Sequence, residues 1–151
     1  IADTDTIDSA TCRIFGSTGA DPAPNLPAIN VFSSAPASNT ALVGGDFDSL
    51  GTTAFATKIE FADWSTTAYN TFTINATGLL DISKTGITKY GLVEADFDVP
   101  NVAPTWNATT ATSMGCKMAE IVGTSNDPEL AVTHSVAAIA GMRRLTLMGA
   151  G

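Results

Sequence analysis

The chain has few charged residues, and few of these are basic. Charged side chains make up 15% of its 151 residues, against about 25% in a typical globular domain. Seven residues are Lys or Arg, fifteen are Asp or Glu, and the formal net charge is −8. Binding of a phosphate backbone or an anionic membrane surface needs clustered cations. The composition therefore argues against nucleic acid and against a membrane surface as partners.

Long apolar runs are also missing. No stretch approaches the ~18–20 apolar residues of a membrane-spanning helix, so no membrane insertion is expected. Hydrophobic residues still make up 44% of the chain, which suits one domain with a real core and without metal or dense disulfides. The surface must then be covered mainly by Thr, Ser, Asn and Gly. Such surfaces are common in secreted β proteins and virion proteins, although an ordinary β domain with few charges has one too.

Helix-favouring segments are nearly absent, and short β-rich runs alternate with turn-rich stretches. This pattern is typical of an all-β sandwich or barrel. Strands are predicted over residues 7–15, 28–32, 57–61, 71–74, 87–93, 114–122 and 129–134. Alternation places Ala10, Cys12 and Ile14 on the inward face of the first strand and Phe72 and Ile74 on that of the fourth.

The connections between these strands carry turn signals. Glycines and prolines mark residues 16–27 as a loop after the first strand. One or two helical turns are predicted over residues 77–83, with Leu79, Leu80 and Ile82 packing over a sheet end.

The C-terminal tail, residues 135–151, differs from the rest. It is apolar, has no acidic residue and carries Arg143 and Arg144. An exposed tail of this kind would be an aggregation hazard. We therefore expect a sandwich domain over residues 1–134 and a tail that packs on its own domain or on a neighbouring subunit.

The two cysteines, Cys12 and Cys116, both fall on inward-facing positions of predicted strands. A disulfide between them would close a loop of about 100 residues and contribute roughly 4–5 kcal/mol, in keeping with an oxidising environment. The alternative is two buried free thiols that act as small apolar core residues. No CxxC motif or nearby histidine completes a metal site.

Catalytic groups are scarce. His134 is the only histidine, so a nucleophilic triad or a His-based metal site would have to use it. It shares a strand face with Leu130 and Val132, and no GxSxG-like elbow accompanies it. A structural role is expected for His134, and the chain is expected not to be an enzyme.

Two short acidic clusters lie in predicted loops. Asp46 and Asp48 form one, and Glu94, Asp96 and Asp98 form the other. Carboxylates of this kind bind Ca²⁺ or serve glycoside hydrolysis, but neither cluster matches a calcium-loop motif. Asp side chains also make turns by bonding to the backbone, which is the main expectation here, with calcium as the alternative and no other cofactor.

Large aromatic side chains give one candidate for ligand stacking. Trp64 and Tyr69 are expected to fill a core corner. Trp106 lies in a loop, where an exposed ring would make a sugar-stacking platform.

Several segments resemble a module of secreted bacterial and phage-encoded proteins, many known from metagenomes, which is related to DNRLRE-type and carbohydrate-binding-module-like jelly rolls. The matching segments are IDSATCRIFGS (7–17), SAPASNTAL (34–42), DFDSLGTTAFAT (46–57), DWSTTAYNTFTINATGL (63–79), ISKTGITKYGL (82–92) and GTSNDPELAVTH (123–134). The resemblance implies a jelly-roll sandwich but no single activity. It departs at His134, where the family usually has an aromatic residue, and at both cysteines.

The family also implies one or two strands ahead of Ile7 that this sequence does not contain. A sheet without them would leave an unpaired edge, completed by the C-terminal tail or by a strand of another subunit. The first functional expectation is therefore a structural subunit outside the cell or on a virus particle: capsid decoration, tail fibre or surface filament. The alternative is a carbohydrate-binding or adhesion module of a larger secreted protein, with glycans as partners.

Overall fold

The computed structural model describes residues 1–22, 25–106, 108, 111–119, 123 and 125–137. Nearly all regular structure in these residues is β, so the protein belongs to the all-β class. The strands are β1 (Thr6–Ala20), β2 (Ala28–Ser33), β3 (Ile59–Glu60), β4 (Tyr69–Thr73), β5 (Tyr90–Glu94), β6 (Ser113–Cys116) and β7 (Glu129–Ser135). The helices are α1 (Ala76–Leu80) and two 3₁₀ helices, η1 (Gly44–Ser49) and η2 (Phe61–Asp63). All of the predicted strands are present, with shifted ends.

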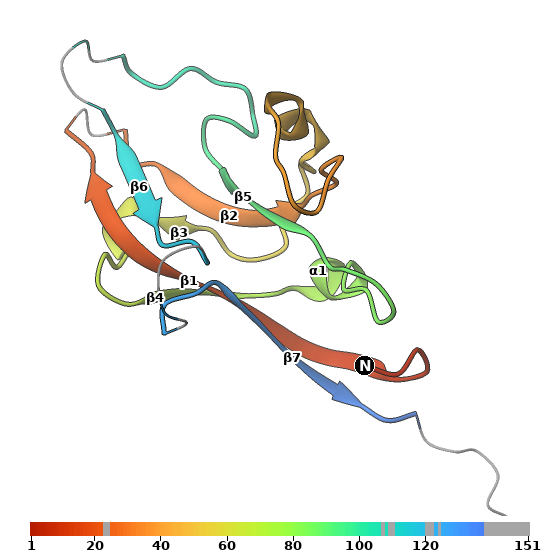
Figure 1. Ribbon diagram of the computed structural model, residues 1–151. Coiled ribbons are helices and arrows are strands. Elements are labelled where there is room, and N and C mark those ends of the chain that lie inside the picture. The colour runs from red at the N-terminus through yellow and green to blue at the C-terminus, as the bar shows by residue number, and fades with distance from the viewer. Residues whose placement is uncertain (23–24, 107, 109–110, 120–122, 124, 138–151) are drawn as a thin grey trace, which may run out of the picture.

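The strands form two antiparallel sheets. The first has the order β4-β1-β6, with β7 also paired to β1, and the second has the order β3-β2-β5. Figure 1 shows β1 running diagonally through the molecule, with β6 beside its C-terminal end and β7 beside its N-terminal half. The chain therefore passes back and forth between the sheets, because β1, β4, β6 and β7 belong to one and β2, β3 and β5 to the other.

β1 organises the first sheet because neighbours pair along both of its edges. Arg13 pairs with Thr71 of β4 and also with Glu129 of β7, so these two strands lie on opposite edges of β1. β6 takes over from β7 near Gly16, where the register shifts. The prediction that the strand ends at residue 15 is wrong. Gly16 does not end the strand, because it allows close approach of another backbone segment: a Cβ there would lie 1.8 Å from the Ser65 carbonyl oxygen.

One hydrophobic core lies between the sheets. Its buried residues include Cys12 and Ile14 of β1, Val31 of β2 and Phe72 of β4, together with Trp64 from a connection. The predicted inward faces of the first and fourth strands are confirmed, since Ala10, Cys12, Ile14, Phe72 and Ile74 are all buried.

Helix α1 forms one short turn over the sheet end. The Asn75 side chain caps it by accepting a hydrogen bond from the Gly78 N–H at 3.0 Å. The predicted packing holds for Ile82, which is 6% exposed, but is wrong for Leu80, which is 88% exposed. Successive helical residues point about 100° apart, so a single turn that packs Leu79 toward the core sends Leu80 to solvent.

The last two strands also differ from the prediction. β6 ends at Cys116, whereas the prediction extended the strand to residue 122, and Met118 is 54% exposed. β7 matches its prediction to within one residue. Two predicted segments lie outside the described residues: residues 120–122 of the sixth strand and residues 138–151 of the C-terminal tail. The expected packing of the tail therefore also lies outside them.

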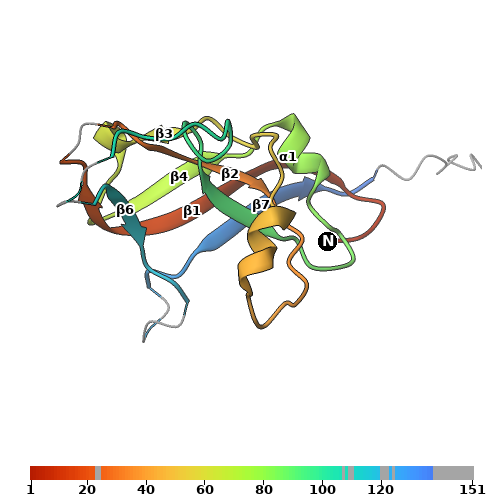
Figure 2. The same cartoon turned by 90° about the horizontal axis from the view of Figure 1, so that it is seen from above.

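The connection that contains η1 stands away from the sheets. Figure 2 shows this segment, in orange, projecting to one side of the strands. Its apolar side chains Leu42, Val43 and Phe47 are all more than half exposed. Among the residues with described structure, no helix has the length and hydropathy needed to cross a bilayer.

Candidate binding site

A pocket of about 260 Å³ opens between the two sheets, beside the C-terminal end of β1. Met114 on one wall pairs with Gly19 of β1, and Ile29 on the opposite wall belongs to β2. The apolar part of its lining consists of Pro27, Ile29, Phe97, Pro104 and Met114. Its volume falls just below the ~300 Å³ at the lower end of drug-sized ligand sites. The pocket therefore suits one or two side chains or a single sugar ring.

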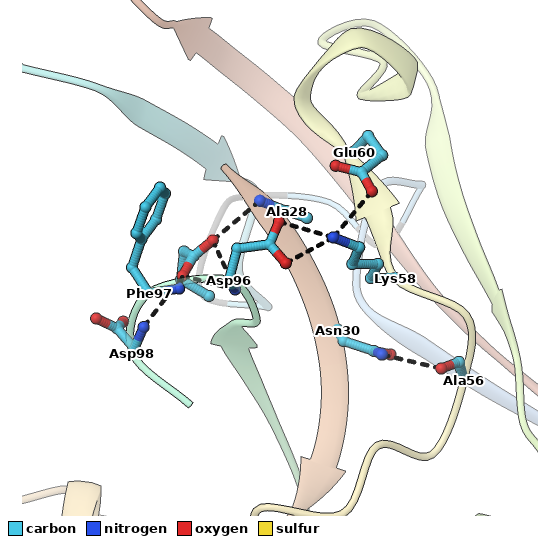
Figure 3. Close-up of polar contacts among 9 residues, drawn as sticks. Ala28, Asn30, Ala56, Lys58, Glu60, Asp96, Phe97 and Asp98 are labelled. Carbon is cyan, nitrogen blue, oxygen red and sulfur yellow. Dashed lines mark hydrogen bonds and ion pairs between the residues drawn. The ribbon is translucent and has the colours of Figure 1, made fainter. Parts of the chain in front are cut away.

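Glu94, the last residue of β5, shapes one wall of this pocket. Its carboxylate accepts hydrogen bonds from the N–H groups of Ala28 at 3.0 Å, of Asp96, of Phe97 and of Asp98 at 3.1 Å. The loop after β5 is thus wrapped around one carboxylate and tied to the start of β2 (Figure 3). Because both Glu94 oxygens are occupied, this residue positions the wall and offers no free acceptor to a ligand.

Asp96 is also engaged. The Lys58 Nζ lies 2.6 and 2.8 Å from the two Asp96 carboxylate oxygens and 3.0 Å from a Glu60 oxygen, as Figure 3 shows. Hydrogen bonds to Asp96 and Glu60 raise the pKa of Lys58, so this ammonium stays charged and neutralises Asp96. Asp98 differs: its side chain is exposed, and its carboxylate has no hydrogen-bond partner among the described residues. It is the ionic group that the pocket presents to a ligand.

The calcium candidates are split between two separate loops. In η1, the Asp46 carboxylate accepts hydrogen bonds from the N–H groups of Ala37 at 3.0 Å and Val43 at 2.9 Å, and these bonds lower the pKa of Asp46. Asp48 is exposed. Within the described part of the chain, no three His, Cys, Asp or Glu side chains gather as a possible ligand set. Asp46, like Glu94, holds its own turn, as acidic side chains in loops commonly do.

Of the two alternatives for the cysteines, the structure has no disulfide, because Cys12 and Cys116 are both free. Cys116 pairs with Gly16, four residues further along β1 than Cys12. Four residues of strand span on the order of 13 Å, whereas a disulfide needs Cα atoms within about 7 Å of each other. The structure has the alternative, two thiols at or near the core. Burial raises the pKa of Cys12 to about 11 and also raises that of Cys116.

His134 has a structural partner. Its Nδ1 atom lies 2.9 Å from Oδ2 of Asp5, a residue only 4% exposed. The pair joins the start of the chain to the end of β7, since Ile7 pairs with His134. It therefore lies at the opposite end of the first sheet from the pocket, where Gly19 pairs with Met114.

The large aromatic side chains fall into two groups. Trp64 is buried, as expected, and Tyr69 and Tyr90 are partly buried. Burial raises the pKa of Tyr90 to about 12. Trp106 is 85% exposed and lies two residues beyond Pro104, which lines the pocket. Of the four, Trp106 is the ring placed to stack on a ligand.

No protein-family model, no curated protein and no solved structure matches the chain. The resemblance to DNRLRE-type and carbohydrate-binding-module-like jelly rolls therefore rests on the sequence segments alone.

Sequence reasoning named Trp106 and Asp98 but missed the pocket that Asp98 lines. Its apolar walls come from four separate segments, which only the strand pairing brings together. One local signal was available in the sequence. Glu94 is followed closely by Asp96 and Asp98, and this spacing could have predicted a loop whose backbone N–H groups bind the Glu94 carboxylate.

Proposed function

We propose that this protein is a non-enzymatic structural subunit of a virion or another extracellular assembly, such as a capsid decoration, a tail fibre or a surface filament. In this proposal residues 1–134 form a jelly-roll-like sandwich, and copies join through exchange of a strand or of the C-terminal tail. Two antiparallel sheets around one core support the sandwich. The low-charge surface supports a place outside the cell.

The open edge of β7 carries this proposal. Among the described residues, β7 pairs with β1 and with no other strand. It is seven residues long, contains no proline and has a single acidic residue, Glu129, at its start. Proteins usually blunt an edge strand with charge, proline, a bulge or short length. β7 lacks charge and proline along most of its length, and its ladder with β1 has one register shift, between Ile7 and Ser9, near the end of the strand. Its outer edge is therefore suited to pairing with another chain.

The C-terminal tail strengthens the case. It leaves β7 after Ser135, and Val136 is 78% exposed. The remaining residues are mostly apolar and include no acid. A segment of this composition needs a surface to pack on, and a neighbouring subunit can supply it.

The test is assembly of the full chain at native concentration, followed by sedimentation velocity and electron microscopy. We expect a filament, a shell or a closed oligomer. Ala131→Lys places a charge in the middle of the exposed β7 edge strand, and we expect it to weaken assembly about tenfold. Ala41→Lys, in an exposed loop, is the matched control. A chain that stays monomeric, or assembly that Ala131→Lys leaves unchanged, argues against strand addition at β7.

A second candidate function has one observation in its favour. Trp106 presents an exposed ring two residues from Pro104, which lines a pocket of about the size of one sugar ring, and this suits a carbohydrate-binding or adhesion module. Glycan-array binding that Trp106→Ala abolishes would support it. Leu42→Ala, which removes an equally exposed apolar side chain elsewhere, is the control. Absence of glycan binding by the unmodified chain would leave the structural role alone.

A further inference from the structure

The pocket and the C-terminal tail are complementary in polarity and charge. We propose that the pocket receives residues 142–148 of a second copy of this chain, so that subunits join head to tail. This inference rests on the proposed function, and it names the segment that is exchanged and the site that accepts it.

The pocket offers apolar walls and negative charge. Half of its ten lining residues are apolar, two are acidic (Glu94 and Asp98), and none is Lys or Arg. Asp98 holds the carboxylate without a partner among the described residues. Exposed apolar side chains lie close to the lining residues in the sequence: Leu26 lies between two of them, and Val102 and Trp106 lie two residues on either side of Pro104.

The tail offers the matching groups. Residues 142–148 read MRRLTLM, in which Arg143 and Arg144 are the only adjacent pair of basic residues in the chain. All fifteen acidic residues lie elsewhere. In an extended segment Leu145 and Leu147 project from the same side. One of these side chains can fill the pocket while an arginine pairs with Asp98.

The positions of the two features favour a second copy over the tail's own domain. Ser135 pairs with Thr6, whereas Met114 of the pocket pairs with Gly19, and thirteen residues of β1 separate these pairs. That separation is on the order of 40 Å along the strand. Figure 1 shows the two ends, with β7 finishing near the N-terminus and β6 beside the arrowhead of β1.

The direction of the chain adds to this argument. β7 runs antiparallel to β1, so it leaves Ser135 heading away from the pocket. Leu145 is ten residues beyond Ser135 and can reach at most about 35 Å from it. Reaching its own pocket would need a full reversal and nearly complete extension. The pocket of the next copy requires neither, and a contact between different surfaces of identical subunits builds a ring or an open filament.

The chain supplies matched controls for a test. The triplet Asp96-Phe97-Asp98 beside the pocket has a counterpart in Asp46-Phe47-Asp48 on the projecting η1 segment. Phe47 is 58% exposed, so this second triplet also offers an apolar side chain and a free acid. Binding that depends on the first triplet and not on the second assigns the pocket.

The experiment measures binding of a fluorescently labelled peptide with the sequence of residues 138–151 by anisotropy. The receptor is the full chain with Arg143→Asp and Arg144→Asp, whose own tail no longer competes. Added Phe97→Ala should weaken peptide binding at least about tenfold, while Phe47→Ala and Asp48→Arg should leave it unchanged. Circular dichroism establishes that each variant is folded.

Exchanging the charges of Asp98 and of the two peptide arginines separates a loss of charge pairing from a packing defect in the variant. The full chain with Asp98→Arg alone should bind the peptide roughly tenfold more weakly. The same variant should bind a second peptide, with Asp at positions 143 and 144, as tightly as the chain with Asp98 binds the unmodified peptide. Binding that ignores Phe97 and Asp98, or that depends on Phe47 and Asp48 instead, overturns the pocket assignment. If the unmodified chain still assembles in that case, the proposed function stands. A chain that neither assembles nor binds the peptide overturns both.

Discussion

At the scale of single residues, Asp5 shows how the start of the chain is fixed. Its side chain is almost fully buried, Oδ1 has no hydrogen-bond partner among the described residues, and Oδ2 lies against His134. A buried acceptor left unpaired costs about 1–3 kcal/mol. His134 therefore matters more for stability than its exposed position on β7 suggests.

His134→Ala should lower the free energy of unfolding by about 1–2 kcal/mol, because it leaves the buried Asp5 carboxylate without its partner. The lower part of the range applies because the His134 side chain is itself 37% exposed. Urea denaturation gives the value. Thr133→Ala, at the neighbouring exposed position, should cost no more than about 0.5 kcal/mol. Equal losses in the two variants would show that the contact between His134 and Asp5 contributes nothing.

Cys12 should make stability fall in alkaline solution. Burial raises the pKa of its thiol from 9.0 to about 11, so between these values the unfolded chain has released the proton that the folded chain still holds. Stability therefore falls as pH rises. The contribution is complete below pH 9 and lost by about pH 11, and it amounts to about 2–3 kcal/mol.

Cys12→Ala should remove this slope between pH 9 and 11 in denaturation curves, after an allowance for the constant loss of the sulfur's packing. The slope that remains comes from groups whose pKa is also raised in the fold, and it therefore has the same sign: Cys116 by burial, Lys58 by its hydrogen bonds, and Tyr90, whose pKa burial raises to about 12. An unchanged slope between pH 9 and 10 in Cys12→Ala would contradict the assignment.

Residue-level prediction from the sequence succeeded where alternation alone decides the outcome. Cys12 and Phe72 face the core because a strand sends every second side chain to the same side. It left the pairing of Cys12 with Cys116 open, since a shared inward face does not fix the register between strands. It failed for Leu80 because the length of the helix, and so the face that packs, depends on tertiary contacts.

At the scale of elements, β1 depends on a glycine in its C-terminal half. The strand passes from β7 to β6 at Gly16, beside the backbone of Ser65. Sequence reasoning took this glycine as the start of a loop, because glycine marks both turns and close backbone approach. Only the position of Ser65, fifty residues away, separates the two.

Gly16→Ala should lower the free energy of unfolding by about 3 kcal/mol, since its Cβ would overlap the Ser65 carbonyl oxygen and backbone must move. Gly19→Ala in the same strand is the matched control. The nearest atom to its Cβ would be Thr66 Cγ2 at 3.4 Å, an ordinary contact, so this variant should be neutral or slightly stabilising. Thermal unfolding compares the two. Similar melting temperatures would contradict the close approach at Gly16.

At the scale of the whole molecule, the two ends of the first sheet carry different features. One end holds the Asp5–His134 pair and the exit of the C-terminal tail, and the other holds the pocket. The all-β class was predictable from local patterns of strands and turns. The pocket was not, because Pro27, Phe97 and Met114 meet only after β1, β2, β5 and β6 have paired.

The fold should not depend on the C-terminal tail. Among the described residues, every member of the core cluster, together with the partly buried residues packed against it, lies between Ile7 and Val132, and β7 is complete at Ser135. A chain that ends after Ala137 should therefore keep its β-sheet circular dichroism, and its free energy of unfolding should change by less than about 1 kcal/mol. The same chain should lose assembly, because it retains the pocket but lacks the segment proposed to fill it. Sedimentation velocity and thermal unfolding on one sample separate the two effects. A truncated chain that unfolds would show that the tail packs on its own domain, whereas a folded chain that still assembles would leave strand addition at β7 as the route between subunits.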